Sequence, residues 1–111
     1  MTTDYRMPES HAFGRWCFDA TTSDLCDGAA TTRLEPQVAK LLDYFLRHQN
    51  TLISRDELMA AVWENRIVSD DAVNRCISIL RQILSPDDKN AFIETVVRRG
   101  FVSHFPPPPA K

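Results

Sequence analysis

Residues 54–84 of the chain read SRDELMAAVWENRIVSDDAVNRCISILRQIL, and this stretch decides the fold. Its first four letters form the S-x-x-E pattern, in which Ser54 and Glu57 satisfy free backbone N–H groups at a helix start. The helix is expected to end near Trp63, where a short loop begins. Its expected buried side chains are Leu58, Ala61 and Val62.

The second half of the same stretch predicts a longer helix with one apolar and one polar face. Ser69 or Asp70 caps its start, where acidic side chains interact favourably with the helix dipole. The apolar face repeats at helical spacing and consists of Val73, Cys76, Ile77, Leu80 and Leu84. Opposite lie Asp71, Asn74, Arg75, Ser78 and Gln82, with Arg81 on the flank.

Upstream, the chain predicts a small antiparallel sheet followed by one more helix. Short alternating runs are separated by turn residues at 21–24 and 27–28. The buried face of this sheet would consist of Trp16, Phe18, Leu25 and Leu34. Pro36 suits the first turn of the helix, and Asn50 is expected to follow its end in the left-handed conformation. Its apolar stripe is Val38, Leu41, Leu42, Phe45 and Leu46.

Downstream, two β-rich runs at residues 92–97 and 101–105 flank Arg98, Arg99 and Gly100. This pattern predicts a hairpin with a basic tip. Adjacent arginines at such a tip are poorly placed for internal ion pairs, and guanidinium groups suit phosphates or a narrow minor groove. The alternative interpretation is a basic tip that only faces solvent.

The order of sheet, helix, helix, loop, helix and hairpin indicates a helix-turn-helix variant followed by a wing. Asn, Arg, Ser and Gln side chains on the third helix carry groups that can bond base edges or phosphates in a major groove. The candidate DNA contacts are Asn74, Arg75, Ser78 and Arg81 on the helix and Arg98 and Arg99 in the wing. The alternative is an ordinary solvated helix face.

The length, hydrophobicity and charge of the chain limit the classes of protein to which it can belong. The chain has 111 residues, the size of one domain, and contains no apolar run near the roughly 20 residues of a membrane span. No secretory signal opens it, so a cytoplasmic location is expected. The net charge of −2 argues mildly against nucleic acid. However, residues 66–111 carry seven basic against five acidic side chains, and residues 1–65 carry six against ten.

The cysteines and histidines suggest neither a metal site nor an active site. Cys17, Cys26 and Cys76 match no metal-ligand spacing and are expected to be reduced thiols. Cys17 and Cys26 flank a predicted hairpin and could form a redox pair, the alternative being two small buried apolar residues. The histidines, His11, His48 and His104, are scattered along the chain. We therefore expect that the chain is not an enzyme and that it binds no metal and no cofactor.

Several motifs in this order resemble the OmpR/PhoB-type winged helix-turn-helix domain. They are LEPQ at 34–37, SRDEL at 54–58 with Val62-Trp63, VSD at 68–70 through Asn74, ISILR at 77–81, and IETVVRRGF at 93–101. The last motif is most similar to the CadC/ToxR-like branch. The resemblance covers residues 13–105, with residues 1–12 as a flexible leader and 106–111 as the start of a Pro-rich linker.

The resemblance implies an α+β fold with an N-terminal antiparallel four-stranded sheet, three helices and a C-terminal β-hairpin wing. It implies a sequence-specific, double-stranded DNA-binding domain of a bacterial transcriptional regulator, which pairs as a homodimer on DNA and makes no membrane contact itself. It also implies contact with RNA polymerase through the loop containing Glu64, Asn65 and Arg66. The alternative function is a winged-helix protein-interaction module with little DNA affinity.

Overall fold

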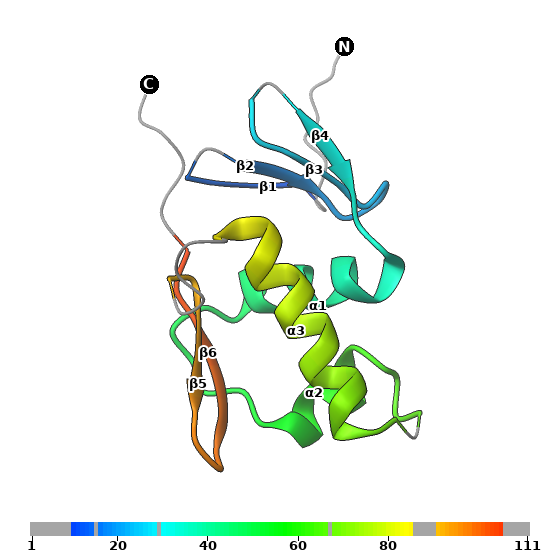
Figure 1. Cartoon of the computed structure of the whole chain (residues 1–111), viewed down its shortest axis with the longest axis vertical. Coiled ribbons are helices and arrows are strands. Elements are labelled where there is room, and N and C mark those ends of the chain that lie inside the picture. The colour runs from blue at the N-terminus through cyan, green and yellow to red at the C-terminus, as the bar shows by residue number, and fades with distance from the viewer. Residues whose placement is uncertain (1–9, 15, 29, 67, 86–90, 106–111) are drawn as a thin grey trace.

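The computed structural model describes residues 10–14, 16–28, 30–66, 68–85 and 91–105 (Figure 1). A four-stranded antiparallel sheet comes first, in the order β1 (Ser10–Phe13), β2 (Trp16–Asp19), β3 (Asp24–Cys26) and β4 (Thr31–Arg33). Three helices follow: α1 (Pro36–Arg47), α2 (Arg55–Ala61) and α3 (Asp70–Leu84). The strands β5 (Ile93–Val96) and β6 (Gly100–Ser103) form a separate hairpin. This is the expected α+β winged-helix architecture.

The sheet lies over the helices and turns one face toward them (Figure 1). Trp16, Phe18 and Leu25 are buried on that face, as the alternating pattern predicts. The strand β1 begins at Ser10, inside the segment assigned to a flexible leader, so that boundary is wrong for residues 10–12. Its sequence shows little strand pattern, and it is a strand because it pairs along its whole length with β2. Residues 1–9 and 106–111 of the predicted leader and linker lie outside the described residues.

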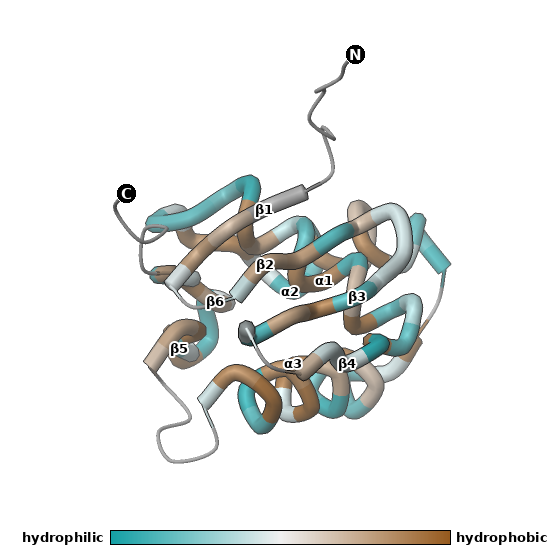
Figure 2. Tube along the Cα trace, turned by 90° about the horizontal axis from the view of Figure 1, so that it is seen from above, coloured by the Kyte–Doolittle hydropathy of each residue, from teal (hydrophilic) through white to brown (hydrophobic). Residues whose placement is uncertain are grey.

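The helices bury the stripes that their periodicity predicts. All five expected apolar residues of α1 and all five of α3 are buried, and α1 packs against α3. Hydrophobic and hydrophilic stretches alternate along α3 in the hydropathy colouring of Figure 2. Ala61 was expected to be buried but is exposed, because α2 ends there and the chain turns to bury Val62 and Trp63 instead.

The starts of α2 and α3 follow the capping rules, with one exception, whereas α1 begins with Pro36 and has no side-chain cap. Ser54 accepts a hydrogen bond from the backbone N–H of Glu57 at 3.0 Å, and Ser69 does the same for Ala72 at 3.2 Å. The Glu57 carboxylate, expected to complete the capping box at Ser54, instead accepts a hydrogen bond from the Tyr44 hydroxyl on α1. Glu57 therefore joins two helices rather than closing its own first turn.

Four aromatic rings connect the sheet to the base of the hairpin. The ring of Phe13 lies 5.6 Å from that of Trp16 and 5.0 Å from that of Phe105. Phe92 in turn lies 5.4 Å from Trp16 and 6.0 Å from Phe105. Edge-to-face and offset pairs of this kind contribute about 0.5–1.5 kcal/mol each beyond burial. This aromatic cluster holds the two ends of the described fold together.

The hairpin is also fixed to the segment that precedes α2. Ile53 and Phe101 exchange two backbone hydrogen bonds, each 2.8 Å long. Gly100 lies beside this bridge with φ +142°, and a Cβ atom there would lie 2.0 Å from the Ile53 carbonyl oxygen. Only glycine lets β6 approach this closely. Within the described residues, no helix is both long enough and apolar enough to cross a membrane.

Candidate nucleic-acid interface

The exposed face of α3 carries the polar side chains that the sequence predicts there. Asn74, Arg75 and Ser78 are exposed, because the opposite face of the helix is held in the core. Asp70 and Asp71 lie in the first turn, where they complement the helix dipole but bring negative charge to the same end. The donors and acceptors on this face can reach base edges or phosphates.

Arg55, the first residue of α2, joins three elements. Its guanidinium donates a hydrogen bond of 2.9 Å to Oδ1 of Asn74 on α3 and lies 5.2 Å from the ring centre of Phe101 on β6. The contact uses the carbonyl oxygen of Asn74, so the amide nitrogen of this exposed side chain remains a hydrogen-bond donor for a ligand. The sequence pattern did not indicate Arg55 as a contact residue, because Arg55 stands inside a capping pattern that already explained the segment.

Arg75 lies beside a carboxylate on another element. Its guanidinium is 3.5 Å from Oε2 of Glu35, the residue that precedes α1, and both side chains are more than half exposed. An exposed pair at this distance contributes little to stability, at most about 1 kcal/mol. Arg75 is therefore easily released toward a negatively charged ligand.

Arg81 is placed differently from the other three candidates on α3. Its guanidinium donates to the backbone oxygen of Ile93 at 2.7 Å and 3.1 Å, and to the Thr95 hydroxyl at 2.8 Å. The side chain is half-buried, and burial lowers the pKa of Arg81 from its ordinary value. Arg81 therefore spans from α3 to β5, and its hydrogen bonds hold the hairpin beside the helix.

The hairpin tip presents both predicted arginines to solvent. Val97, Arg98 and Arg99 form the turn and are all exposed, and the Arg99 N–H donates to the Val96 carbonyl at 2.9 Å. Arg98 has φ +65°, a left-handed conformation that costs a non-glycine residue about 1–2 kcal/mol. The chain thus keeps an arginine where glycine would fit with less strain.

A cleft of about 250 Å³ separates this tip from the start of α2. Three arginines, Arg55, Arg98 and Arg99, are among its lining residues, and Asp56 is the one acidic residue among them. Arginines from the start of α2 and from the hairpin tip thus line one concavity next to the polar face of α3. Such an arrangement favours a phosphate-bearing ligand.

The loop after α2 is exposed but well ordered by hydrogen bonds. Glu64 and Asn65 both have positive φ, at 54° and 64°. The Lys40 ammonium donates to Glu64 at 2.8 Å, and this hydrogen bond lowers the pKa of Glu64. The Asn65 N–H bonds the Met59 carbonyl at 2.9 Å. Glu64, Asn65 and Arg66 are therefore presented to solvent in a fixed backbone geometry.

Ligands for a metal ion do not come together in the part of the chain that the structure describes. No group of three or more His, Cys, Asp or Glu side chains there is arranged to hold one.

Comparison with known proteins identifies the fold and the family. The chain is 33% identical over 90 residues to the transcriptional activator CadC of Escherichia coli K12, covering 79% of this chain and 18% of CadC. It therefore spans less than a fifth of that relative. The structure of the DNA-binding domain of E. coli CadC superposes with a TM-score of 0.78 at 31% identity, covering 92% of this chain and 96% of that domain.

A second solved structure shows the same fold. The DNA-binding domain of Klebsiella pneumoniae RstA, solved in complex with the RstA box, gives a TM-score of 0.70 at 22% identity and covers 86% of this chain and 96% of that one. The family model described as "Transcriptional regulatory protein, C terminal" matches residues 29–103. The matched residues include all three helices and both strands of the hairpin. The chain therefore belongs to the OmpR/PhoB-type winged-helix family of transcriptional regulatory proteins.

Proposed function

We propose that this domain binds double-stranded DNA with sequence specificity as part of a bacterial transcriptional regulator, with α3 in the major groove and the β5–β6 tip at the minor groove. One observation carries the proposal. Arg55 both bonds Asn74 on the exposed face of α3 and lines the cleft below Arg98 and Arg99. The base-reading face and the arginine-lined cleft are therefore parts of one continuous surface.

The side chains on this surface divide into two roles. Asn74, Arg75 and Ser78 carry the hydrogen-bonding groups for base edges. Arg98 and Arg99 contact phosphates or the minor groove, and Arg55 contacts a phosphate from the start of α2. Arg81 acts indirectly by holding β5 against α3, so that helix and wing meet one duplex together. The DNA-binding domain of RstA, which shares this fold, was solved in complex with the RstA box, and this supports DNA binding as the function.

DNA binding is tested by fluorescence anisotropy on a duplex selected from a random pool, measured over a range of salt concentrations. Replacing both Arg98 and Arg99 by Ala should weaken binding to every duplex. Each lost phosphate contact should reduce the slope of log K on log salt by about 0.9. The matched control replaces Arg33 and Arg47, two exposed arginines on β4 and α1, and should change the slope less.

The same titration separates the proposal from a protein-interaction role, which the net charge of −2 favours. Specific binding to the selected duplex but not to a scrambled one supports the DNA-binding role. If the domain binds neither duplex at low salt, the surface around α3 serves a protein partner instead. Unchanged affinity and slope in a folded Arg98/Arg99 variant would remove the wing from the interface.

Two further partners belong to the proposal. The loop containing Glu64, Asn65 and Arg66 is exposed and is hydrogen-bonded to the end of α2 through its backbone, which suits contact with RNA polymerase. Alanine variants there should reduce transcription without reducing DNA affinity. A second copy of the domain binds an adjacent half-site on the same duplex. The domain acts by binding rather than by catalysis, and it acts in the cytoplasm, where the bacterial chromosome lies.

A further inference from the structure

Two cysteines face each other on the outer side of the N-terminal sheet. Cys17 on β2 and Cys26 on β3 are direct partners in the antiparallel register. Their neighbours Trp16, Phe18 and Leu25 are buried, whereas Cys17 is exposed and Cys26 is half-buried. Because side chains alternate between the faces of a strand, both thiols lie on the face turned away from the core.

The backbone pattern sets the distance between these residues. The Asp27 N–H bonds the Ala30 carbonyl at 3.0 Å, toward the β4 side of the sheet. The backbone groups of the preceding residue, Cys26, therefore point the other way, toward Cys17. A hydrogen-bonded antiparallel pair of this kind has Cα atoms about 5.5 Å apart. That spacing lies inside the range of about 4.4–6.8 Å found for disulfides.

A disulfide here would be strained and therefore easily reduced. Cβ atoms of directly opposed residues lie about 4.5–5.5 Å apart, whereas a disulfide draws them to about 3.5–4.5 Å. The strands would have to twist locally, which the short β2–β3 ladder of three residue pairs permits. Strained disulfides have more oxidising potentials and are the labile ones. The site therefore suits reversible oxidation rather than a permanent cross-link.

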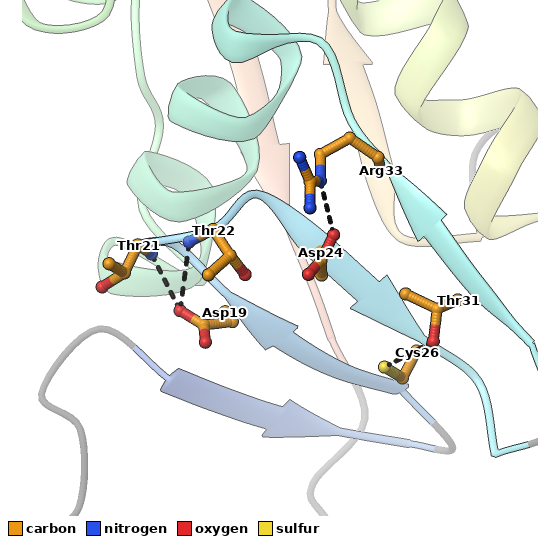
Figure 3. Close-up of polar contacts among 7 residues, drawn as sticks. All are labelled: Asp19, Thr21, Thr22, Asp24, Cys26, Thr31 and Arg33. Atoms are coloured by element: carbon orange, nitrogen blue, oxygen red, sulfur yellow. Dashed lines mark hydrogen bonds and ion pairs between the residues drawn. The ribbon is translucent and has the colours of Figure 1, made fainter.

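The surroundings give the two thiols different roles. Sγ of Cys26 lies 3.2 Å from the Thr31 hydroxyl on β4 (Figure 3), within reach of a hydrogen bond between the two side chains. Asp24 on the same face bonds Arg33 at 2.6 Å, so its charge is paired and repels a thiolate less. Cys17 is the more accessible thiol.

We propose that Cys17 and Cys26 form a peroxide-sensitive dithiol pair, in which Cys17 is oxidised first and Cys26 resolves it to an intramolecular disulfide. The Cys17 thiolate attacks one oxygen of hydrogen peroxide, the O–O bond breaks, and the products are a sulfenic acid and hydroxide, which takes up the proton that the Cys17 thiol released and becomes water. The Cys26 thiolate then attacks the Cys17 sulfur, forms the S–S bond and expels hydroxide. This hydroxide takes up the proton that Cys26 released. Overall, the two thiols lose two protons and two electrons, and one peroxide becomes two waters.

The third cysteine provides an internal reference. Cys76 is buried on α3, and burial raises the pKa of its thiol. A thiol that is both buried and protonated reacts slowly with peroxide. The redox pair is independent of the proposed DNA binding, since it lies on the sheet and needs no ligand of α3.

The test treats the 111-residue chain with hydrogen peroxide and counts free thiols by alkylation and mass spectrometry. The number of free thiols per chain should fall from three to one, with Cys76 still reduced. The mass of the chain should be lower by two hydrogen atoms, and no disulfide should join two chains. A dithiol reductant should restore the three thiols. The Cys26→Ser variant should instead retain a Cys17 sulfenic acid that a dimedone probe labels. Thr31→Val should slow closure and let that acid accumulate, whereas Cys76→Ala should close normally.

Three results would overturn the proposal. One is a wild-type chain that keeps all three thiols at peroxide levels that oxidise a free cysteine peptide. Another is a disulfide that joins two chains or includes Cys76. The last is a Cys17 that proceeds to sulfinic acid with Cys26 still free.

Discussion

Tyr44 and Glu57 form the polar contact that joins α1 to the first turn of α2. The hydrogen bond to the Glu57 carboxylate, with a smaller effect of burial, raises the pKa of Tyr44 from 10.0 to about 12. Because the pKa is higher in the folded than in the unfolded state, the stabilisation is complete below pH 10. It is lost as the pH rises from about 10 to about 12.

A titration of phenolate absorbance checks this contact. The chain has two tyrosines, so a Tyr5→Phe variant reports Tyr44 alone, and we expect its midpoint near pH 12. In the same background, Glu57→Ala should move the midpoint back toward 10 because the acceptor is gone. A midpoint near 10 with Glu57 present would mean that the hydrogen bond does not form.

Glu35 holds Arg75 beside the proposed DNA surface and adds a negative charge there. We expect Glu35→Gln to tighten binding to all duplexes by up to about fivefold, since a surface ion pair contributes at most about 1 kcal/mol. Asp43→Asn is the matched control, because it removes the same charge from a pair with Arg47 within α1. Anisotropy titrations measure the DNA affinity of both variants. An equal gain in affinity in the two variants would indicate a general effect of net charge.

For single residues, the sequence predicted well which side chains of α3 are exposed, but it did not predict which residues they contact. Periodicity correctly placed Asn74, Arg75 and Ser78 on the solvent side. It could not show that Arg81 bonds β5 or that Arg55 bonds Asn74, because these contacts join residues 12 and 19 positions apart. Long side chains reach partners that tertiary packing supplies, and the local pattern carries no record of them.

At the scale of whole elements, the position of the β5–β6 hairpin beside Ile53 depends on one glycine. A Cβ at Gly100 would collide with the backbone of Ile53, so Gly100→Ala should destabilise the fold by about 1–3 kcal/mol and loosen the wing. Gly28→Ala is the control, because Gly28 also has positive φ, at +99°, but no atom lies within 4 Å of the added Cβ. Urea unfolding measures both, and equal losses would attribute the effect to φ alone.

Elements with strong local signals were the ones that the sequence predicted well. Both serine caps and the stripes of α1 and α3 are confirmed, because capping and amphipathic burial act within one or two turns. The strand β1 was missed because its pairing with β2, and not its own residues, makes it a strand. Ala61 was misplaced because α2 is only seven residues long and the chain turns directly after it.

As a whole molecule, the domain has one recognition helix and a net charge of −2, so it gains little long-range attraction to DNA. We therefore expect weak binding to one half-site and cooperative binding to two half-sites spaced by about one helical turn, roughly 10 base pairs. Moving one half-site by about five base pairs should abolish cooperativity, because it turns that site to the opposite side of the duplex. Electrophoretic mobility shifts on the two spacings measure this, and a single site bound as tightly as the pair would contradict it.

The aromatic cluster also determines how the domain responds to a pulling force. Phe13 and Phe105 lie at opposite ends of the described chain, yet their rings are 5.0 Å apart. A tension applied through the flanking segments would therefore act first on these rings and on β1, which is an edge strand of its sheet. Because β1 is at the edge, its ladder with β2 is the one ladder that holds it in the described sheet. The first contacts to bear that tension thus lie at the sheet and at the base of the hairpin, and not at the hairpin tip or on the exposed face of α3, the surface that we propose reads DNA.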